Sequence, residues 1–476
     1  MLYRQIVDEK LAQYAYLIGC PRTGEALLVD PERDIDRYLE LAASEGLRIA
    51  AVAETHIHAD FLSGSRELAE RLPDLRLYLS DEGDADWKYE WVDAGDPRVV
   101  LLKHGDRFRV GNIDVEAVHT PGHTPEHMSF LVTDRGGGAE DPMGVLSGDF
   151  LFVGDLGRPD LLESAAGHEG VQEPSARRLY ASTRDFLRRE DHLQIWPAHG
   201  AGSACGKALG DVPQSTLGYE RRYNAAIGAA GRSETEFVDF ILEGQPDPPL
   251  YFARMKRDNK IGPRILGRLP TPRELDPAEL AAVREDPQSV IVDTRACAED
   301  YLSGHVKGSI YAPLDRSFPT VVGSFLRPED KIHLIVEADH VNEAVRDLIR
   351  IGLDRVEGFL PADRVGEAGA DTSTASIDFA TLERRRGEDI RVLDVRKTSE
   401  YADGHIPDSL HIPHTRLASR LDELPRDREL LVHCQSGKRA KAAVSLLERA
   451  GFHATLVDDA FPAWCDANAS RVEVTA

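Results

Sequence analysis

One stretch of eight residues, 54–61, constrains the fold of this chain more than any other part of the sequence. It reads Glu-Thr-His-Ile-His-Ala-Asp-Phe, which places His56, His58 and Asp60 within five residues. The apolar run 49–53 precedes it and predicts a buried strand, and the residues after it have the apolar spacing of a helix. Imidazole and carboxylate groups on a loop between a rigid strand and a helix can converge on a metal ion. The stretch therefore predicts a metal site rather than a solvated polar loop.

Three further candidate ligands lie at the ends of predicted strands. His123 closes the run His-Thr-Pro-Gly-His, Asp149 follows a glycine after an apolar run, and His199 lies in Pro-Ala-His-Gly. Together with the first stretch, these motifs resemble the metallo-β-lactamase superfamily, in which the corresponding groups close over one or two metal ions. The resemblance covers about the first half of the chain and implies an αββα sandwich.

One departure from the superfamily pattern limits the number of metal ions that the predicted site can bind. Its two-metal hydrolases have a histidine directly after the loop aspartate, whereas this chain has Phe61, whose phenyl ring cannot coordinate a metal. The remaining pattern resembles the mononuclear branch, the persulfide (sulfur) dioxygenases. That resemblance implies one ferrous ion, Fe(2+), per chain, held by His56, His123 and Asp149 with positions open for substrate and dioxygen. It also implies that three further groups orient the ligands or bind substrate: His58, Asp60 and His199.

Two residues near these motifs have two interpretations each. Arg158, in Gly-Arg-Pro-Asp, either pairs with Asp160 in a turn or, as the family resemblance implies, borders the substrate cleft. Cys205 follows the histidine of Pro-Ala-His-Gly by six residues, so it either approaches the iron or is a structural residue of a tight loop. Glutathione-using relatives have an Asp-Tyr pair after that histidine, whereas this chain has Gly200 and Ala201, which leaves the carrier thiol open.

The composition limits the partners and the compartment. A formal net charge of −25 over 476 residues argues against nucleic acid or an anionic membrane as a partner. No apolar stretch has the length that a membrane span needs, and the N-terminus shows no signal-peptide pattern. Five cysteines, widely spaced and without a Cys-x-x-Cys pair, fit a reducing cytoplasm. We expect a cytoplasmic protein that acts on small molecules and forms a homo-oligomer, a dimer or tetramer.

The second half of the chain contains an internal repeat with a period of about a hundred residues. Val-Asp-Thr-Arg at 292–295 and Tyr-Leu-Ser-Gly-His at 301–305 recur as Leu-Asp-Val-Arg at 393–396 and Tyr-Ala-Asp-Gly-His at 401–405. Each copy alternates short apolar runs with helical patterns, which predicts a parallel, doubly wound α/β sheet. These runs resemble rhodanese domains.

The expected fold class is therefore an α/β multidomain chain, a metallo-β-lactamase sandwich followed by two rhodanese-like domains. Proline-rich segments at 245–249 and 263–277 predict an extended connector before the repeat. Residues 81–91, rich in aspartate, tyrosine and tryptophan, are expected to be an exposed insertion. The expected domains are a dioxygenase at 1–262, a first repeat at 270–365 and a second repeat at 375–476.

A cysteine marks the candidate active loop of the second copy. Cys434 lies between an apolar run and a helical pattern, where backbone N–H groups and the helix dipole favour the thiolate. Lys438 and Arg439 add positive charge that suits an oxyanion such as sulfite or thiosulfate. The run Cys-x-x-Gly-x-Arg resembles the rhodanese active loop. At the same place the first copy has Glu337 and Asp339 and no cysteine, so it resembles a pseudo-rhodanese.

The combined pattern resembles bacterial sulfide-detoxifying fusions and implies two linked reactions. The iron group would oxidise a low-molecular-weight thiol persulfide with dioxygen to sulfite, and Cys434 would transfer a sulfane sulfur to sulfite, giving thiosulfate. One alternative is a zinc thioester hydrolase of the glyoxalase II type with a sulfurtransferase appendage, which Phe61 disfavours. Another is a sulfur-carrier protein without enzymatic activity, which the intact ligand set disfavours.

Overall fold

The computed structural model describes residues 1–164 and 170–474. The chain divides into two compact units, Met1–Arg268 and Leu269–Ala476, and each has hydrophobic cores of its own. None of the described helices is long and apolar enough to cross a membrane.

The described part of the first unit is built on two six-stranded sheets. In the sheet β1-β2-β3-β4-β5-β6, the strands β1 to β3 pair antiparallel and β3 to β6 run parallel. In the sheet β12-β11-β10-β9-β8-β7, β10 and β11 are parallel and the other neighbours antiparallel. The strands are β1 (Leu2–Asp8), β2 (Gln13–Cys20), β3 (Glu25–Val29), β4 (Arg48–Ala53), β5 (Arg76–Ser80), β6 (Val99–Leu102), β7 (Arg107–Val110), β8 (Ile113–His119), β9 (Met128–Asp134), β10 (Gly144–Gly148), β11 (Gln194–Pro197) and β12 (Ser215–Thr216).

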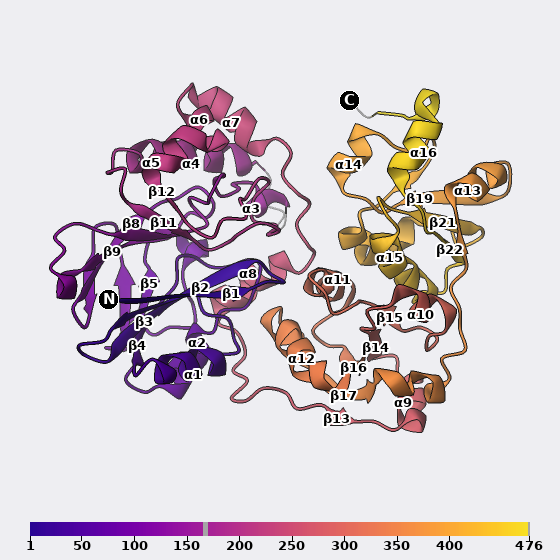
Figure 1. The fold of residues 1–476 in the computed structure, drawn as a ribbon, viewed down its shortest axis with the longest axis horizontal. Coiled ribbons are helices and arrows are strands. Elements are labelled where there is room, and N and C mark those ends of the chain that lie inside the picture. Colours follow the sequence, from indigo (N-terminus) through magenta and orange to yellow (C-terminus); the bar gives the residue numbers. More distant parts are fainter. Residues whose placement is uncertain (165–169, 475–476) are drawn as a thin grey trace. The chain divides into compact units, whose positions relative to one another are not determined.

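Helices cover the outer face of each sheet, so that the unit has four layers (Figure 1). The expected αββα sandwich is confirmed. Helices α1 and α2 pack on the first sheet, and α4, α6 and α7 pack on the second. The helices are α1 (Asp36–Ser44), α2 (Ser65–Arg71), α3 (Leu161–Ser164), α4 (Gln172–Phe186), α5 (Leu217–Tyr223), α6 (Ala225–Ala230), α7 (Glu234–Leu242) and α8 (Phe252–Ile261), with single 3-10 turns η1 (Ala85–Trp87) and η2 (Arg135–Gly137).

Strand alternation explains the layers. Successive side chains of a strand point to opposite faces of its sheet. In β2, Tyr16 and Ile18 therefore enter the core between the sheets, whereas Leu17 packs under α1 and α2. In β9, Phe130 faces the same inter-sheet core and Leu131 faces the helices of the other side. Both faces of these central strands are buried, which is why their sequences are almost continuously apolar.

The expectation of an exposed insertion at residues 81–91 holds for residues 84–86 and Glu90 but is wrong for Trp87 and Tyr89. Trp87 and Tyr89 are each 5% exposed and belong to the core between the first sheet and its helices. The segment has the acidic composition of a surface loop, but its aromatic rings bury apolar area against the protein, and that gain determines where the segment lies.

The second unit repeats one topology twice. Its two five-stranded parallel sheets, among the described residues, have the orders β13-β17-β16-β14-β15 and β18-β22-β21-β19-β20, which are the same order when the strands are counted from the start of each copy. Short helices connect successive strands (Figure 1). A parallel strand pair needs such a crossover connection, which explains the alternating apolar and helical patterns of the sequence.

The elements of the two copies correspond in order. The first copy contains β13 (Arg273–Glu274), α9 (Pro277–Val283), β14 (Ser289–Asp293), α10 (Ala298–Ser303), β15 (Ile310–Tyr311), α11 (Phe318–Phe325), β16 (Lys331–Val336), η3 (Ala338–His340), α12 (Val341–Arg350), β17 (Val356–Pro361) and η4 (Ala362–Ala368). The second contains β18 (Ser376–Ile377), α13 (Phe379–Arg385), β19 (Ile390–Asp394), α14 (Thr398–Asp403), β20 (Leu410–His411), η5 (His414–Ser419), η6 (Leu421–Glu423), β21 (Glu429–His433), α15 (Lys438–Arg449), β22 (Ala454–Val457), α16 (Phe461–Ala467) and η7 (Ala469–Arg471).

The repeated sequence motifs have one structural role in both copies. Arg295 pairs with Asp293 at the end of β14 and donates to the carbonyl oxygen of Gly304 at 2.9 Å. Arg396 makes the equivalent pair in the second copy and donates to the Gly404 carbonyl at 2.7 Å. The arginine thus ties the strand end to the end of the following helix. The motif recurs because it closes this turn, whether or not a reaction takes place beside it.

Candidate functional site

The candidate ligands of the first unit come together although they are far apart in sequence. His56 follows β4, His123 lies between β8 and β9, and Asp149 follows β10. One ligand atom from each lies within 4.8 Å of the others, and none of the three side chains is more than 2% exposed. The structure therefore places two imidazoles and a carboxylate on one buried point at the ends of their strands.

Hydrogen bonds determine which nitrogen of each histidine can bind a metal. Nδ1 of His123 donates to the carbonyl oxygen of Arg158 at 3.0 Å, so its Nε2 lone pair faces Asp149, whose Oδ2 lies 3.4 Å away. Burial lowers the pKa of His123 to about 4, which keeps the ring neutral. A neutral imidazole with one nitrogen bonded to the protein is the form that binds metals.

A relay from Asp30 orients His56 in the same way. Asp30 accepts the backbone N–H and the hydroxyl of Thr55, both at 2.8 Å. Because the Thr55 proton goes to Asp30, its oxygen accepts the Nδ1 proton of His56 at 2.9 Å, which leaves Nε2 free. Asp30 also lies 3.1 Å from Nε2 of His58. Burial opposes a positive charge on His58, but Asp30 and neighbouring carboxylates outweigh it and raise the pKa of His58 to about 9. His58 is therefore paired with Asp30, the residue that also holds Thr55.

Asp149 shows that the group fits a metal ion. Both of its carboxylate oxygens are buried and accept no hydrogen bond from the described residues, a costly state unless a cation is present. Burial raises the pKa of this carboxyl, and His199 opposes the shift. Its backbone N–H donates to Nε2 of His127 at 3.0 Å. Gly148 has φ +55°, and a Cβ there would lie 2.5 Å from the same nitrogen, so a larger residue would displace the aspartate.

A second buried group lies beside the first. Asp60, His199 and Cys205 have ligand atoms within 4.8 Å of one another. Nε2 of His199 lies 3.2 Å from Asp60 Oδ2 and 3.4 Å from Asp149 Oδ1. The cysteine therefore approaches the candidate metal group. Burial, with Asp149 and Asp60 nearby, raises the pKa of the Cys205 thiol well above its usual value, which favours the neutral thiol.

Arg158 pairs with Asp160, as the turn interpretation expects. It is 1% exposed and forms a bidentate pair with Asp160 at 2.8 and 2.6 Å. Its Nη1 donates to the carbonyl oxygen of Ala204 at 2.9 Å, while its own carbonyl accepts from His123. Through these bonds one arginine connects a metal-group histidine to the loop that carries Cys205.

Three positioning residues were missed by reasoning on the sequence. His127 stacks on His56, with ring centroids 5.1 Å apart, and holds Asp149. Asn259 of α8 donates to the carbonyl oxygens of His58 and Phe61 at 2.8 and 2.7 Å. Asp30 accepts two hydrogen bonds from Thr55, which in turn orients His56. The position of His127, four residues after His123, was a usable signal, whereas nothing marked the other two because their partners lie far along the chain.

The candidate sulfur-transfer loop lies at the end of β21. Cys434 is 1% exposed, and the loop turns at Gly437, with φ +80°, into α15. Both nearby cations already have anionic partners: Arg439 pairs with Glu400 at 2.5 and 2.8 Å, and Lys438 pairs with Asp315 of the first copy at 2.8 Å. An oxyanion at this loop would therefore compete with two carboxylates.

The corresponding loop of the first copy has acidic residues and no cysteine. After β16 ends, Glu337 and Asp339 are exposed, and the short turn η3 begins where the cysteine loop would be. No described residue of this loop is a nucleophile of the kind that sulfur transfer needs.

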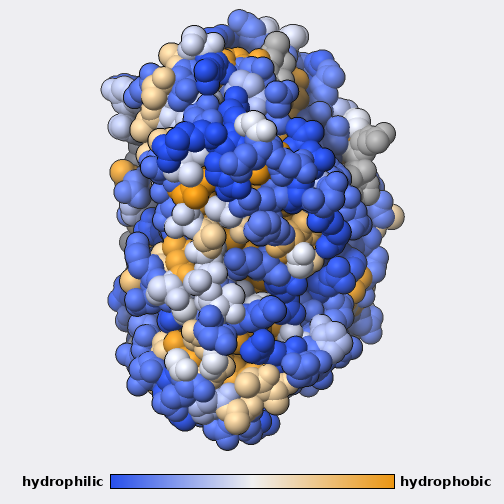
Figure 2. Space-filling model, turned by 90° about the vertical axis from the view of Figure 1, so that its right-hand side faces the viewer, coloured by the Kyte–Doolittle hydropathy of each residue, from blue (hydrophilic) through white to orange (hydrophobic). Residues whose placement is uncertain are grey.

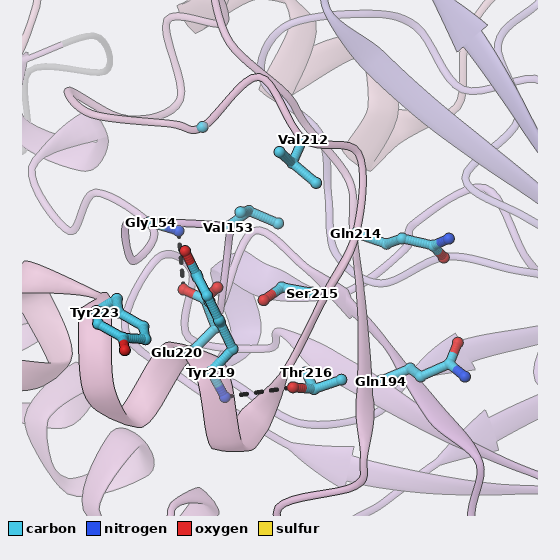
Figure 3. Close-up of a pocket in the computed structure, with 11 residues that line it drawn as sticks. Val153, Gly154, Gln194, Val212, Gln214, Ser215, Thr216, Tyr219, Glu220 and Tyr223 are labelled. Carbon is cyan, nitrogen blue, oxygen red and sulfur yellow. Dashed lines mark hydrogen bonds between the residues drawn. The ribbon is translucent and has the colours of Figure 1, made fainter.

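A separate pocket of about 700 Å³ lies between α5 and the segment 210–216 (Figure 3). Tyr219 and Tyr223 border it with ring centroids 4.7 Å apart, and Glu220 beneath them accepts the N–H of Gly154 at 2.9 Å. None of the described candidate ligands lines this pocket. It is thus distinct from the metal group.

Two family models match the sequence. The model of the metallo-beta-lactamase superfamily matches residues 9–199, and that of the rhodanese-like domain matches residues 380–467. The first match contains the candidate metal ligands, and the second contains Cys434 with its loop.

Individual relatives match different shares of the chain. Persulfide dioxygenase ETHE1 of Bos taurus is 29% identical over 42% of this chain and 68% of its own length. A hydroxyacylglutathione hydrolase of Synechococcus is 32% identical over 51% of this chain and 93% of its own length. The solved structure of a metallo-beta-lactamase from Staphylococcus aureus is 39% identical, with a TM-score of 0.66, and covers 76% of this chain and 98% of its own.

The fold, the ligands at the strand ends and these matches all indicate the same superfamily. The relatives are enzymes by name, and the match to the superfamily model spans His56, His123 and Asp149. The chain belongs to the metallo-β-lactamase superfamily and has a rhodanese-like domain at its C-terminal end.

Proposed function

We propose that this chain is a non-heme iron persulfide dioxygenase coupled to a rhodanese sulfurtransferase. The observation that carries the first part is Phe61, which replaces a possible second-site imidazole beside an intact buried group of His56, His123 and Asp149. The similarity to persulfide dioxygenase ETHE1 supports it. The overall reaction is RSSH + O₂ + H₂O → RSH + H₂SO₃.

The donor set suits one ferrous ion. Two neutral imidazoles and one carboxylate on a single face resemble the facial arrangement of non-heme iron oxygenases, which leaves coordination positions open. A bound ferrous ion would supply sites for the persulfide sulfur and for dioxygen. The protein would hold His123 through Arg158 and Asp149 through His127, so that the ligand atoms need no rearrangement.

The groups around the ligands bind and orient the substrate in this proposal. Asp60 and His199 carry polar atoms that face the candidate metal group, and Cys205 lies beside them. These three would receive the persulfide end of the substrate, and His58 would hold the loop in place through Asp30. The carrier thiol is left open between glutathione, coenzyme A and others.

The second part of the proposal concerns Cys434. Its thiolate attacks the outer sulfur of a persulfide, the S–S bond breaks, and the thiol leaves with the proton. Sulfite then attacks the sulfur held on Cys434, which gives thiosulfate and restores the thiolate. Arg439 and Lys438 would bind the oxyanion. The first copy, with the same strand order and no such cysteine, is a pseudo-rhodanese in this proposal.

The two parts are tested together on full-length protein purified without oxygen. We expect about one iron per chain and oxygen uptake when a thiol persulfide is added. Wild type should accumulate thiosulfate, whereas Cys434→Ser should consume oxygen at the wild-type rate and accumulate sulfite. About two zinc ions per chain with thioesterase activity would refute the dioxygenase, and thiosulfate formation by Cys434→Ser at the wild-type rate would refute the transferase.

A second candidate function is thioester hydrolysis with a sulfurtransferase appendage. It is favoured by the identity of 32% to a hydroxyacylglutathione hydrolase and by the retained pair of Asp60 and His199. Phe61 disfavours it because a two-metal hydrolase needs an additional ligand at that position. We expect no hydrolysis of a hydroxyacyl thioester by the iron-loaded protein above the rate without it.

A further inference from the structure

We infer that the pocket beside α5 binds an organic cation, a primary ammonium group carried on an apolar ring or chain. The inference does not depend on the reaction proposed above, because none of the described candidate metal ligands lines this pocket. Its volume of about 700 Å³ is in the range of pockets that enclose small molecules. The pocket lies between α5 and the segment 210–216, and the loop that contains Gly154 also borders it (Figure 3).

Glu220 supplies a buried carboxylate to this pocket. The residue is 1% exposed, and its Oε2 accepts the N–H of Gly154 and the side-chain amide of Asn224, both at 2.9 Å. Its Oε1 is buried and makes no hydrogen bond with the described residues. A buried acceptor without a donor is costly, so this oxygen points to a ligand that donates an N–H group.

The charge of the pocket lining decides which kind of donor suits this oxygen. None of the described residues that line the pocket is a lysine, an arginine or a histidine, so the lining offers Glu220 no cation. A ligand with a positive charge would compensate the carboxylate, whereas a phosphate or carboxylate group would be repelled by it. The expected head group is therefore an ammonium rather than a neutral alcohol or an anion.

Two exposed tyrosine rings border the same pocket. Tyr219 and Tyr223 are four residues apart on α5, their ring centroids are 4.7 Å apart, and they are 56% and 66% exposed. The face of an aromatic ring attracts a cation, and a ligand that covers such a ring also buries apolar area. Val153 and Val212 add apolar surface that suits the ring or chain of the ligand.

The buried carboxylate also holds a loop on which binding can be detected. Glu220 accepts from Gly154, and Asn224 donates to the carbonyl oxygen of Asp155 at 3.0 Å. These bonds hold the loop between β10 and α3 against the end of α5. A ligand that orders Glu220 would therefore slow local opening of this loop.

The experiment measures binding of phenethylamine, which is protonated at neutral pH, to the full-length protein by isothermal titration calorimetry. We expect one equivalent to bind, and 2-phenylethanol, a neutral molecule of nearly the same shape, to bind roughly tenfold more weakly or worse. Amide hydrogen exchange with the amine present should slow in the segments 150–156 and 210–223. Binding without this local protection would place the amine elsewhere on the protein and overturn the site.

Two variants remove the two features of the site separately. Glu220→Gln removes the charge but retains an oxygen for Gly154, and it should weaken amine binding by about tenfold or more. Tyr219→Ser changes an exposed side chain, so it should fold normally, and it should weaken binding by about threefold or more. Ile261→Ser, which alters an exposed apolar residue of α8 that does not line the pocket, is the matched control and should bind the amine as wild type does.

The other outcomes would overturn the proposal. Equal affinity of wild type and both pocket variants would show that neither the carboxylate nor the tyrosine ring binds the amine. Failure of wild type to bind the amine would exclude the site. A smaller particle for Tyr219→Ser than for wild type in light scattering would then show that a second copy of the chain covers the tyrosines instead.

Discussion

Single residues that lie far from the candidate ligands along the chain determine where those ligands point. Arg158 bonds to Asp160, to the Ala204 carbonyl and, through its own carbonyl, to His123. A lysine could not reproduce this arrangement, since a guanidinium presents a planar fork of donors and an ammonium does not. The residue is buried, so its three bonds cannot be replaced by water.

Replacing Arg158 with methionine should therefore destabilise the first unit by about 3–5 kcal/mol, because the buried carboxylate of Asp160 loses its bidentate pair with the guanidinium. Iron content should fall with it, since the backbone carbonyl that accepts from His123 is no longer held in place by the guanidinium and its bond to Ala204. Thermal unfolding and metal analysis measure the two effects. Arg109→Met is the matched control, because Arg109 pairs with Asp114 at 2.6 Å on the surface and should change stability little. Equal effects of the two substitutions would contradict this account of Arg158.

At the level of elements, β21 and α15 define the sulfur-transfer loop. His433 ends β21 next to Cys434, stacks on Phe461 of α16 with centroids 5.3 Å apart, and is fully buried. Burial lowers its pKa from 6.5 to about 4, with Asp394 acting in the opposite direction. The folded element therefore contains a neutral histidine at neutral pH.

This burial predicts a loss of stability in acid. Between pH 6.5 and about 4 the unfolded chain binds a proton at His433 that the folded one does not, so stability falls as the pH falls through this window. The contribution is about 2 kcal/mol between pH 7 and pH 5. Hydrogen exchange of β19 and β21 measures it, as the difference between wild type and His433→Gln. The same pH dependence in both proteins would show that His433 is not its source.

Helix α15 also connects the two copies of the repeat. Ser445 of α15 accepts the N–H of Tyr311 at 2.9 Å, and Arg449 donates to the Gly308 carbonyl at 3.0 Å. Lys438, at the start of α15, pairs with Asp315. The first copy thus contributes a carboxylate to the loop of the second.

Asp315→Asn should free Lys438 for an anionic substrate. We expect the KM for thiosulfate to fall by up to about fivefold, the range of an exposed ion pair, with kcat unchanged. The effect should shrink in high salt. Steady-state sulfur transfer measures it, and Glu357→Gln, an exposed acid of the same copy that pairs with Arg355, should leave KM unchanged. An increase in KM would show that Asp315 helps to bind the substrate.

At the level of the whole molecule, the two proposed reactions belong to different compact units. The candidate iron ligands lie in Met1–Arg268, and Cys434 with the residues that contact its loop lies in Leu269–Ala476. The space-filling view in Figure 2 shows one face of the chain, where hydrophilic residues predominate and hydrophobic ones are scattered among them. Each unit buries apolar cores of its own, so a change at one site need not unfold the other.

Removal of iron should separate the two activities. A chelator should abolish oxygen uptake on a persulfide, whereas transfer of sulfur from thiosulfate to a thiol should continue at the untreated rate, because no described residue of the cysteine loop is a candidate iron ligand. Oxygen electrode traces and thiol persulfide assays on one preparation measure both. Loss of both activities on chelation would show that the units depend on each other.

Much of the fold follows from the sequence alone because strands and ligands leave local signals. The apolar run 49–53 predicted the buried strand β4, and the position of His56, His123 and Asp149 at strand ends indicated one converging group. The repeated Asp-x-Arg run likewise indicated two copies of one topology, since the arginine closes the same local turn in each.

Tertiary structure decided the partners of those residues. Asp30 holds Thr55, Asn259 holds the carbonyl of Phe61, and Asp315 pairs with Lys438, although long stretches of chain separate each pair. Local sequence determines the direction of a side chain on its own element but not the segment that packs against it. Which of two carboxylates meets a buried histidine depends on how the sheets and helices stack, and that stacking is settled by burial of apolar surface over the whole unit.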